Sequence, residues 1–370
     1  MQTCLDIDGV DFLINGRPTY EGVEWAGRRI EGLLLNSRMV QAIFDDEHPE
    51  TRSCWAYLDT GQWDPDRNTR EFCDMLPVYR RHGLLAVTVG LQGGGSIYTA
   101  PIYERYINTA FAPDGSLKPA YMERLRRVLR AADAAGMVVI VNYFYWRQER
   151  FESDHAVRQA TRNATQWLLE TGYRNVMVDL KNEIMEGDGI LKSRGIHELL
   201  QIARATTLNG RRLPVATSTH PAKHLPQGDW PKYVDVFMPH GNDSLPDAWR
   251  SELRALKRSD VYRAHPRPVC CNEDSVDLCN LSVSVEEGCS WGYYDQGFGC
   301  GQKQGKFDWS ASGRESTQSA LSGFQTLPVN WSLNTPHKRA FFARIALITG
   351  ADPQPGDTPG QAGDAAQNDK

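Results

Sequence analysis

Eight short apolar runs recur along this chain, and stretches with helical spacing separate several of them. The runs are 29–36, 84–91, 137–143, 175–180, 213–218, 234–238, 268–271 and 289–293. Three of the intervening segments, 119–135, 154–171 and 197–204, carry apolar residues three and four positions apart. Strands that alternate with helices predict parallel pairing through right-handed crossovers. Eight such units predict an α/β fold, a (β/α)8 TIM barrel, with an open doubly wound sheet as the alternative.

Three segments lie outside this repeat. Residues 10–20 contain Asn15-Gly16 between apolar residues, which predicts a short β-hairpin before the first barrel strand. Residues 297–325 are rich in Gly, Ser and Gln and follow the eighth strand, so we expect a long loop on the catalytic face. Residues 351–370 contain no large apolar side chain and should form a disordered tail. We therefore expect a single catalytic domain over residues 1–350.

Charge and composition exclude several classes of protein. Lys and Arg number 41 and Asp and Glu 46, a net charge of −5, so we expect no nucleic-acid partner. The longest apolar runs, such as 137–141, fall far short of the ~20 residues that cross a bilayer, so we expect no membrane span. No leader-like segment precedes residue 16, which indicates a cytoplasmic protein or a leader already removed. No CxxC or zinc-type spacing occurs, so we expect neither metal nor cofactor.

Two glutamates follow apolar runs at corresponding places in the repeat. Strand four ends in Asp179-Leu180-Lys181-Asn182-Glu183, and strand seven continues through Asn272-Glu273-Asp274. In a barrel the functional side chains lie at the C-terminal ends of the strands, and strands four and seven lie nearly opposite each other. We therefore expect Glu183 and Glu273 to face each other across the barrel mouth. The alternative is that both are surface or salt-bridge residues.

A facing pair of carboxyl groups suits the cleavage of glycosides with retention of configuration. One group must be protonated to donate to the leaving oxygen, and the other must be ionised to attack the anomeric carbon. Like charges ~5–5.5 Å apart do not ionise together easily, so the pKa of the acid partner should be raised. Because successive strand residues face opposite sides, Asn182 and Glu183 reach one site only through a bulge or kink.

The two glutamate segments resemble a known group of enzymes. Residues 179–183 resemble the strand-four Asn-Glu signature of clan A (β/α)8 glycoside hydrolases, residues 268–273 resemble their nucleophile segment, and the hairpin is similar to the opening of family 5-like enzymes. The resemblance in order and spacing spans roughly residues 10–345. It implies that Glu183 is the acid/base, that Asn182 contacts the sugar 2-hydroxyl, that Glu273 is the nucleophile, and that β-linkages are cleaved.

The chain departs from that group at two places. Ile184 follows the acid/base position, where many relatives have Pro, and His240 ends strand six, where relatives often carry an aromatic residue or His-x-Tyr. His240 is therefore a candidate partner of the nucleophile, with a structural histidine as the alternative.

Four further residues at strand ends are candidate substrate contacts. Trp291 is a candidate floor for a sugar ring, because apolar sugar faces stack on indole, and barrel core is the alternative. Arg38, after strand one, is a candidate donor to a sugar hydroxyl or an acidic group, with an ion pair as the alternative. Gln92 and Tyr143 lie at plausible strand ends, and residues 142–146 form an aromatic segment that suits a subsite or the core.

Motifs of other enzyme classes match less well. Gly288-Cys289-Ser290-Trp291-Gly292 fits G-x-S-x-G, but its strand follows the motif, whereas a nucleophile elbow follows its strand. His197-Glu198 begins an H-E-x-x-H pattern that Gln201 interrupts. The sequence thus predicts a retaining β-glycosidase with a carbohydrate substrate. A non-catalytic carbohydrate-binding barrel and a serine esterase using Ser290 are the alternatives.

Overall fold

The computed structural model describes residues 1–94, 105–145, 148, 150–220, 228–242, 244–296, 301–303, 306–308, 323–325 and 327–354. Its central element is a parallel six-stranded sheet in the order β10-β9-β8-β7-β6-β13. These strands are β6 (Asn36–Arg38), β7 (Ala86–Gly90), β8 (Val138–Phe144), β9 (Val176–Lys181), β10 (Val215–Ala216) and β13 (Gly292–Tyr293). A second parallel pair comprises β11 (Ser218–Thr219) and β12 (Met238–Pro239).

The parallel pairing continues around a full circle. Beyond the β11–β12 pair, two parallel bridges join Phe237 to Val269 and Cys270 to Ser290, so that strands six, seven and eight are connected in turn. Strand eight, β13, pairs with strand one, β6. Each of the eight strands therefore pairs with the next, and the eighth pairs with the first. The predicted (β/α)8 barrel is confirmed, and the open sheet is excluded.

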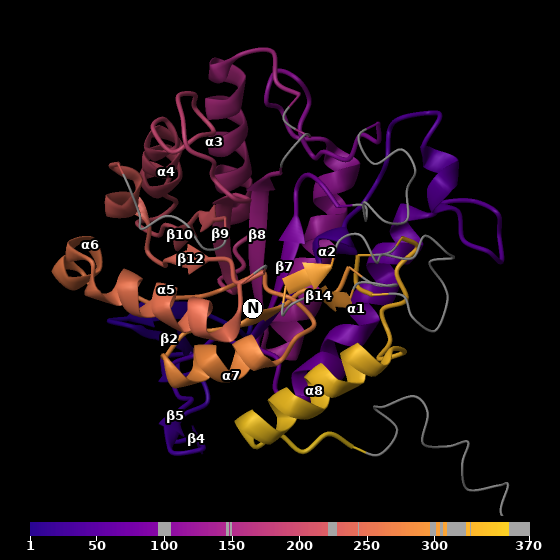
Figure 1. Cartoon of the computed structure of the whole chain (residues 1–370). Helices are drawn as coiled ribbons and strands as arrows, with labels where there is room; N and C mark the ends of the chain where they lie inside the picture. The colour runs from indigo at the N-terminus through magenta and orange to yellow at the C-terminus, as the bar shows by residue number, and fades with distance from the viewer. Residues whose placement is uncertain are drawn as a thin grey trace, which may run out of the picture.

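Helices surround the strands, as Figure 1 shows. The α-helices are α1 (Pro65–Arg81), α2 (Pro119–Ala135), α3 (Asp154–Glu170), α4 (Ile196–Ala205), α5 (Pro246–Arg258), α6 (Asp260–Ala264), α7 (Cys279–Glu286) and α8 (Pro336–Thr349). Short 3-10 helices are η1 (Val40–Ala42), η2 (Arg52–Trp55) and η3 (Trp230–Tyr233). The three helices predicted from spacing are α2, α3 and α4.

Capping residues explain where the longer helices begin. The Asp64 carboxylate accepts from two backbone N–H groups of the first turn of α1, and Pro65 occupies the first helical position. Ser153 and Thr335 cap α3 and α8 in the same way. These caps fix the residue at which each helix begins.

The first barrel strand begins later than the sequence predicts. The sequence predicts one strand over residues 29–36, but the chain first forms a small hairpin, β4 (Glu24–Trp25) with β5 (Arg28–Arg29). A turn then follows, in which Leu33 N–H donates to Ile30 and Gly32 takes a φ of +83°. This turn interrupts the apolar run, so the strand starts at Asn36.

The predicted N-terminal hairpin is present. β1 (Leu5–Asp8), β2 (Asp11–Ile14) and β3 (Arg17–Pro18) form an antiparallel sheet. Asn15 and Gly16 both have positive φ, as a two-residue hairpin turn requires. Phe12, only 1% exposed, packs in one cluster with Leu34, Ala86 and other residues of the barrel strands. The hairpin therefore extends the barrel core.

Two predicted segments lie wholly or largely outside the described residues. Of residues 297–325, the structure describes the antiparallel pair β14 (Gly301–Lys303) and β15 (Lys306–Asp308) and residues 323–325. Of the predicted tail, it describes residues 351–354 only.

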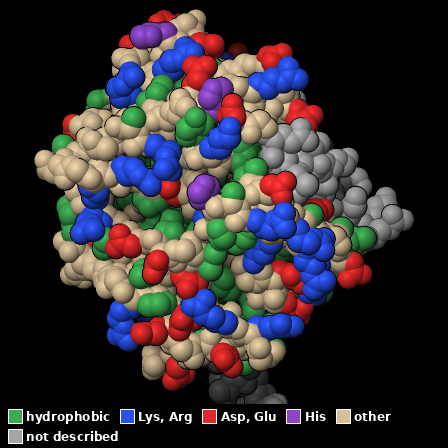
Figure 2. All heavy atoms as spheres, turned by 90° about the vertical axis from the view of Figure 1, so that its left-hand side faces the viewer, with side chains coloured by type: hydrophobic (Ala, Val, Ile, Leu, Met, Phe, Trp, Pro, Cys, Tyr) green, Lys and Arg blue, Asp and Glu red, His purple; other side chains and the backbone are tan. Residues whose placement is uncertain are grey.

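The described surface shows mixed charge. Figure 2 shows Lys and Arg side chains interspersed with Asp and Glu over the face that it presents. Within the part of the chain that the structure describes, no helix is both long and apolar enough to cross a membrane.

Removing the aromatic ring of Phe12 tests whether the hairpin belongs to the core. We expect Phe12→Ala to lower the free energy of unfolding by about 3–5 kcal/mol, because it leaves a cavity between the hairpin and the barrel strands. Val10→Ala, at a position 45% exposed in the same hairpin, should change it by less than about 0.5 kcal/mol. Denaturant titration of both variants measures this, and equal small effects would contradict it.

Candidate active site

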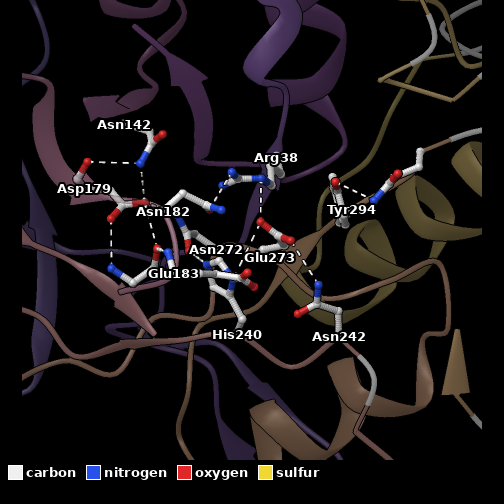
Figure 3. Close-up of polar contacts among 12 residues, drawn as sticks. Arg38, Asn142, Asp179, Asn182, Glu183, His240, Asn242, Asn272, Glu273 and Tyr294 are labelled. Atoms are coloured by element: carbon white, nitrogen blue, oxygen red, sulfur yellow. Dashed lines mark hydrogen bonds and ion pairs between the residues drawn. The ribbon is translucent and has the colours of Figure 1, made fainter. Parts of the chain in front are cut away.

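The end of β9 turns sharply where the first glutamate stands. Glu183 has a φ of +51°, in the left-handed region that a residue with a side chain adopts only at a cost. Its backbone N–H donates to the Ser218 hydroxyl at 3.1 Å, which holds this conformation. The expected kink is confirmed. Because of it, the neighbouring side chains of Asn182 and Glu183 both reach one site (Figure 3).

The structure brings Glu183 and Glu273 together. One carboxylate oxygen of each, with a ring nitrogen of His240, lie within 4.8 Å of one another. The two carboxylates differ in exposure, since the Glu183 side chain is 24% exposed and that of Glu273 is 7% exposed. Glu183 thus faces the more open side of the pair.

Two side chains hold the carboxylate of Glu273. Arg38 Nε lies 2.7 Å from one carboxylate oxygen, and the Asn242 amide donates to the other at 3.0 Å. The Arg38 guanidinium is fully buried and also donates to Asn182 Oδ1 at 2.7 Å. Arg38 therefore links the nucleophile candidate on strand seven to the end of strand four.

His240 lies between the two glutamates. Its Nδ1 is 2.9 Å from Glu183 Oε1 and 3.6 Å from Glu273 Oε2. Its Nε2 is 3.0 Å from Asn272 Oδ1, and Asn272 in turn donates its amide N–H to Asp179 Oδ2 at 3.2 Å. Figure 3 shows these residues beside the two glutamates.

The charges of this group shift the pKa values of its members. Burial raises the pKa of Glu183, but the hydrogen bond and charge of His240 outweigh burial and bring it below the ordinary value. Burial raises the pKa of Glu273, against the opposing charges of Arg38 and His240. Burial alone would lower the pKa of His240, yet the two carboxylates raise it. The expectation of a raised pKa for the acid partner is therefore wrong for Glu183, because the imidazole lies beside it.

The three titratable groups are also the donor set of a possible metal site. Glu183, His240 and Glu273 each direct one ligand atom toward the others. The Arg38 guanidinium, however, already contacts a Glu273 oxygen and would repel a second cation. The donor set alone therefore gives no reason to invoke a metal.

Three sequence candidates lie away from the pair. Gln92 is buried and hydrogen-bonds Thr109 and the backbone of the loop after β8. Tyr143 is buried and its hydroxyl bonds Thr165 of α3, outside the barrel. Trp291 is 0% exposed.

The surroundings of Trp291 leave no ring face for a sugar. Its indole N–H donates to Asp274 at 2.9 Å, and its ring lies 6.0 Å from that of Phe341 in α8. The structure therefore does not bring Trp291 to the glutamates, because its side chain points from strand eight toward the helices. Trp146, at the end of the aromatic segment, lies outside the described residues.

The serine of the competing motif is also remote from the pair. Ser290 is 1% exposed, and its hydroxyl accepts from the backbone N–H of Leu34 at 2.8 Å. A nucleophile needs access to substrate and an adjacent base. The contact of Ser290 is instead structural, at the base of strand eight.

Several site residues were not predicted. Asn242 and Asn272 contact Glu273 and His240, and Asp179 lies fully buried behind them. The rings of Tyr145 and Tyr294 each lie 5.8 Å from the Arg38 guanidinium carbon. The sequence held a signal for Asp179, Asn242 and Asn272. A polar residue within or directly after a buried strand needs a polar partner inside the barrel.

Comparison with known proteins gives structural matches only. No family model and no curated protein matches the chain. A family 5 glycoside hydrolase, PbGH5A from Prevotella bryantii B14, is 12% identical with a TM-score of 0.48, and the match covers 86% of this chain and 95% of that one.

Two further solved structures match at the same level. Lactobacillus rhamnosus beta-glucuronidase is 10% identical, with a TM-score of 0.48 over 85% of this chain and 49% of that one. Saccharomyces cerevisiae Gas2p in complex with laminaritriose and laminaritetraose is 11% identical, with a TM-score of 0.47. That match covers 95% of this chain and 70% of that one. Similarity this low does not assign a function, so the function must be argued from the site.

The placement of Trp291 can be tested by removing its N–H. We expect Trp291→Phe to lower the free energy of unfolding by about 1–3 kcal/mol, because the buried Asp274 carboxyl loses a donor. Trp167→Phe, at a half-buried position on α3, should have a smaller effect. Denaturant titration compares the two, and an unchanged stability in Trp291→Phe would contradict the buried hydrogen bond.

Proposed function

We propose that this protein is a glycoside hydrolase that cleaves β-glycosidic bonds with retention of configuration. The observation that carries the proposal is the pair Glu183 and Glu273 at the ends of strands four and seven, where one carboxylate oxygen of each lies within 4.8 Å of the other. Retaining enzymes hold their carboxyl groups ~5–5.5 Å apart, whereas inverting enzymes need ~6.5–9.5 Å to admit a water molecule. The spacing supports double displacement.

The environments of the two carboxylates support different roles. Glu273 is the less exposed, and Arg38 and Asn242 orient both of its oxygens, as a nucleophile that must attack one carbon atom requires. Glu183 is the more exposed, and the His240 ring contacts one of its carboxylate oxygens. A group on the open side can reach the leaving oxygen.

In the first step, a Glu273 oxygen bonds to the anomeric carbon as the bond to the leaving oxygen breaks. The leaving oxygen takes a proton from Glu183, and a glycosyl-enzyme forms. In the second step Glu183, now ionised, removes a proton from water. The water oxygen bonds to the anomeric carbon, and the bond to Glu273 breaks.

Asn182 supports the proposed transition state. Arg38 holds its carbonyl oxygen, so the amide nitrogen is left to donate to a hydroxyl of the bound sugar. A hydrogen bond to the 2-hydroxyl strengthens as the sugar ring acquires oxocarbenium character, and thus favours the transition state over the ground state.

Replacement of the nucleophile tests the proposal. We expect Glu273→Ala to reduce turnover of aryl β-glycosides by more than about 10³-fold. Azide should restore part of it, because it can enter the vacated space and bond to the anomeric carbon as the leaving group departs, which gives a glycosyl azide. Ser290→Ala, measured as kcat/KM of folded protein, should keep glycosidase activity. The assay uses a panel of aryl β-glycosides and aryl esters.

The same panel separates the alternatives. Unchanged glycosidase activity in Glu273→Ala would contradict the proposal. Ester cleavage that only Ser290→Ala abolishes would indicate the esterase. Carbohydrate binding by a wild type that cleaves neither class would indicate a non-catalytic barrel.

Replacement of the acid tests the role of Glu183. We expect Glu183→Ala to lower kcat/KM about 10²–10⁴-fold for glycosides with a poor leaving group, because these need general acid catalysis. Activated aryl glycosides, whose leaving groups need no proton, should lose much less in this step. Equal losses for both classes of substrate would contradict the assignment.

A further inference from the structure

The surroundings of His240 restrict where its protons can lie. This inference rests on the proposed function, and its first step concerns Nε2, which lies 3.0 Å from Asn272 Oδ1. The Asn272 amide nitrogen faces Asp179 Oδ2 at 3.2 Å. A reversed Asn272 amide would set its oxygen against a carboxylate oxygen, so Asn272 presents its carbonyl to His240. Because a carbonyl only accepts, Nε2 carries a hydrogen.

The contacts of Asp179 fix this orientation of the Asn272 amide. It is fully buried, and the Ser218 backbone N–H donates to its Oδ1 at 2.9 Å. The Asn142 amide donates to Oδ2 at 3.0 Å, beside the Asn272 amide. Burial raises the pKa of Asp179, and these donors, with the charges of His240 and Arg38, act against that rise. The carboxyl group is thus set up as an acceptor.

With Nε2 protonated, the other ring nitrogen has two states only. In the neutral ring Nδ1 is an acceptor, and in the imidazolium it is a donor. Glu183 Oε1 lies 2.9 Å from Nδ1. A hydrogen bond between these two atoms needs one proton, whichever of the two atoms carries it. Either the acid bonds the neutral ring or the carboxylate bonds the imidazolium. The Glu183–His240 pair therefore holds one proton.

We propose that Asp179 and Asn272 lock His240 in the tautomer protonated at Nε2, so that the Glu183–His240 pair stores the proton that the leaving oxygen receives. His240, Asn272 and Asp179 are positioning residues in this scheme, since they act through Glu183. Figure 3 shows Asp179, Asn272, His240 and Glu183 close together at the ends of the barrel strands.

The proton balance of the two steps follows. In the first step the pair releases its one proton through the Glu183 carboxyl to the leaving oxygen. This leaves a Glu183 carboxylate facing the unprotonated Nδ1 of neutral His240. Two acceptors then face each other, which raises the basicity of Glu183 for the second step. Water supplies one proton to the pair as its oxygen bonds to the anomeric carbon, and the resting state returns.

The charged groups around the Glu183–His240 pair set the pH range over which the pair keeps its proton. Glu273 and Glu183 face His240 and raise its pKa above 6.5, while burial and the Arg38 charge act in the opposite direction. Asp179 lies behind Asn272, and the charge of His220 also acts on Glu183. The pair keeps its proton below the folded pKa of His240 and loses it as the pH rises through that pKa. Activity should fall on the alkaline side there.

Nitrogen NMR of the histidine side chains tests the tautomer without any substrate. In the wild type we expect His240 Nε2 to stay protonated across the titration while Nδ1 changes state. His82, whose Nδ1 lies 2.9 Å from the Val78 carbonyl, provides an internal reference of the opposite tautomer. In Asn272→Leu the neutral His240 should switch to protonation at Nδ1, because that form donates to the Glu183 carboxylate.

Two results would overturn the inference. One is a neutral wild-type His240 protonated at Nδ1, and the other is a folded Asn272→Leu variant whose tautomer does not change. Thermal unfolding of the variants establishes that each is folded. If Asn272→Leu does not fold, the tautomer of the wild type still decides.

Kinetics of His240→Gln test the storage of the proton. We expect the alkaline limb of its pH profile to move to lower pH, because Glu183 alone must then hold the proton. A purely structural role would lower activity at all pH values without moving the limb, and that result would overturn the inference. A wild type that cleaves no glycoside would instead overturn the proposed function, whatever the NMR pattern.

Discussion

The site depends on one buried cation. The Arg38 guanidinium is fully buried at the end of strand one, where it contacts the Glu273 carboxylate on strand seven and the Asn182 amide on strand four. A buried charge is tolerated only with close partners, and removing one partner of such a pair typically costs about 3–5 kcal/mol. The three strand ends are therefore tied together by charge as well as by the backbone pairing of the barrel, and the nucleophile candidate is held in place before substrate binds.

The acidic side chains around this cation differ in how deeply they are buried. Asp179 lies fully buried, Glu273 lies at the floor of the mouth, and Glu183 lies nearest to solvent, with His240 between the last two. The left-handed Glu183 backbone is a strained conformation that the Ser218 hydroxyl stabilises. Strain at this residue is consistent with a functional demand, because a regular strand could not direct Asn182 and Glu183 to one site.

Much of the fold and half of the site could be predicted from the sequence. The eight runs, the Asn15-Gly16 hairpin and the two strand-end glutamates depend on local patterns, and the structure bears out the barrel, the hairpin and the kink. The sequence could not show which way Tyr143 and Trp291 point, because a strand buried on both faces is apolar on both faces. Nor could it show that Asn272, His240 and Asp179 form one chain, since their contacts join strands far apart in sequence.

In the proposed mechanism Glu273 forms a covalent bond to the sugar. The most direct measurement is mass spectrometry of the protein after incubation with 2-deoxy-2-fluoro glycosides of a sugar that it cleaves, since these slow the release of the glycosyl-enzyme. We expect one added glycosyl group, located on the peptide that contains Glu273. Turnover of the parent glycoside with no adduct, or an adduct on another residue, would contradict it.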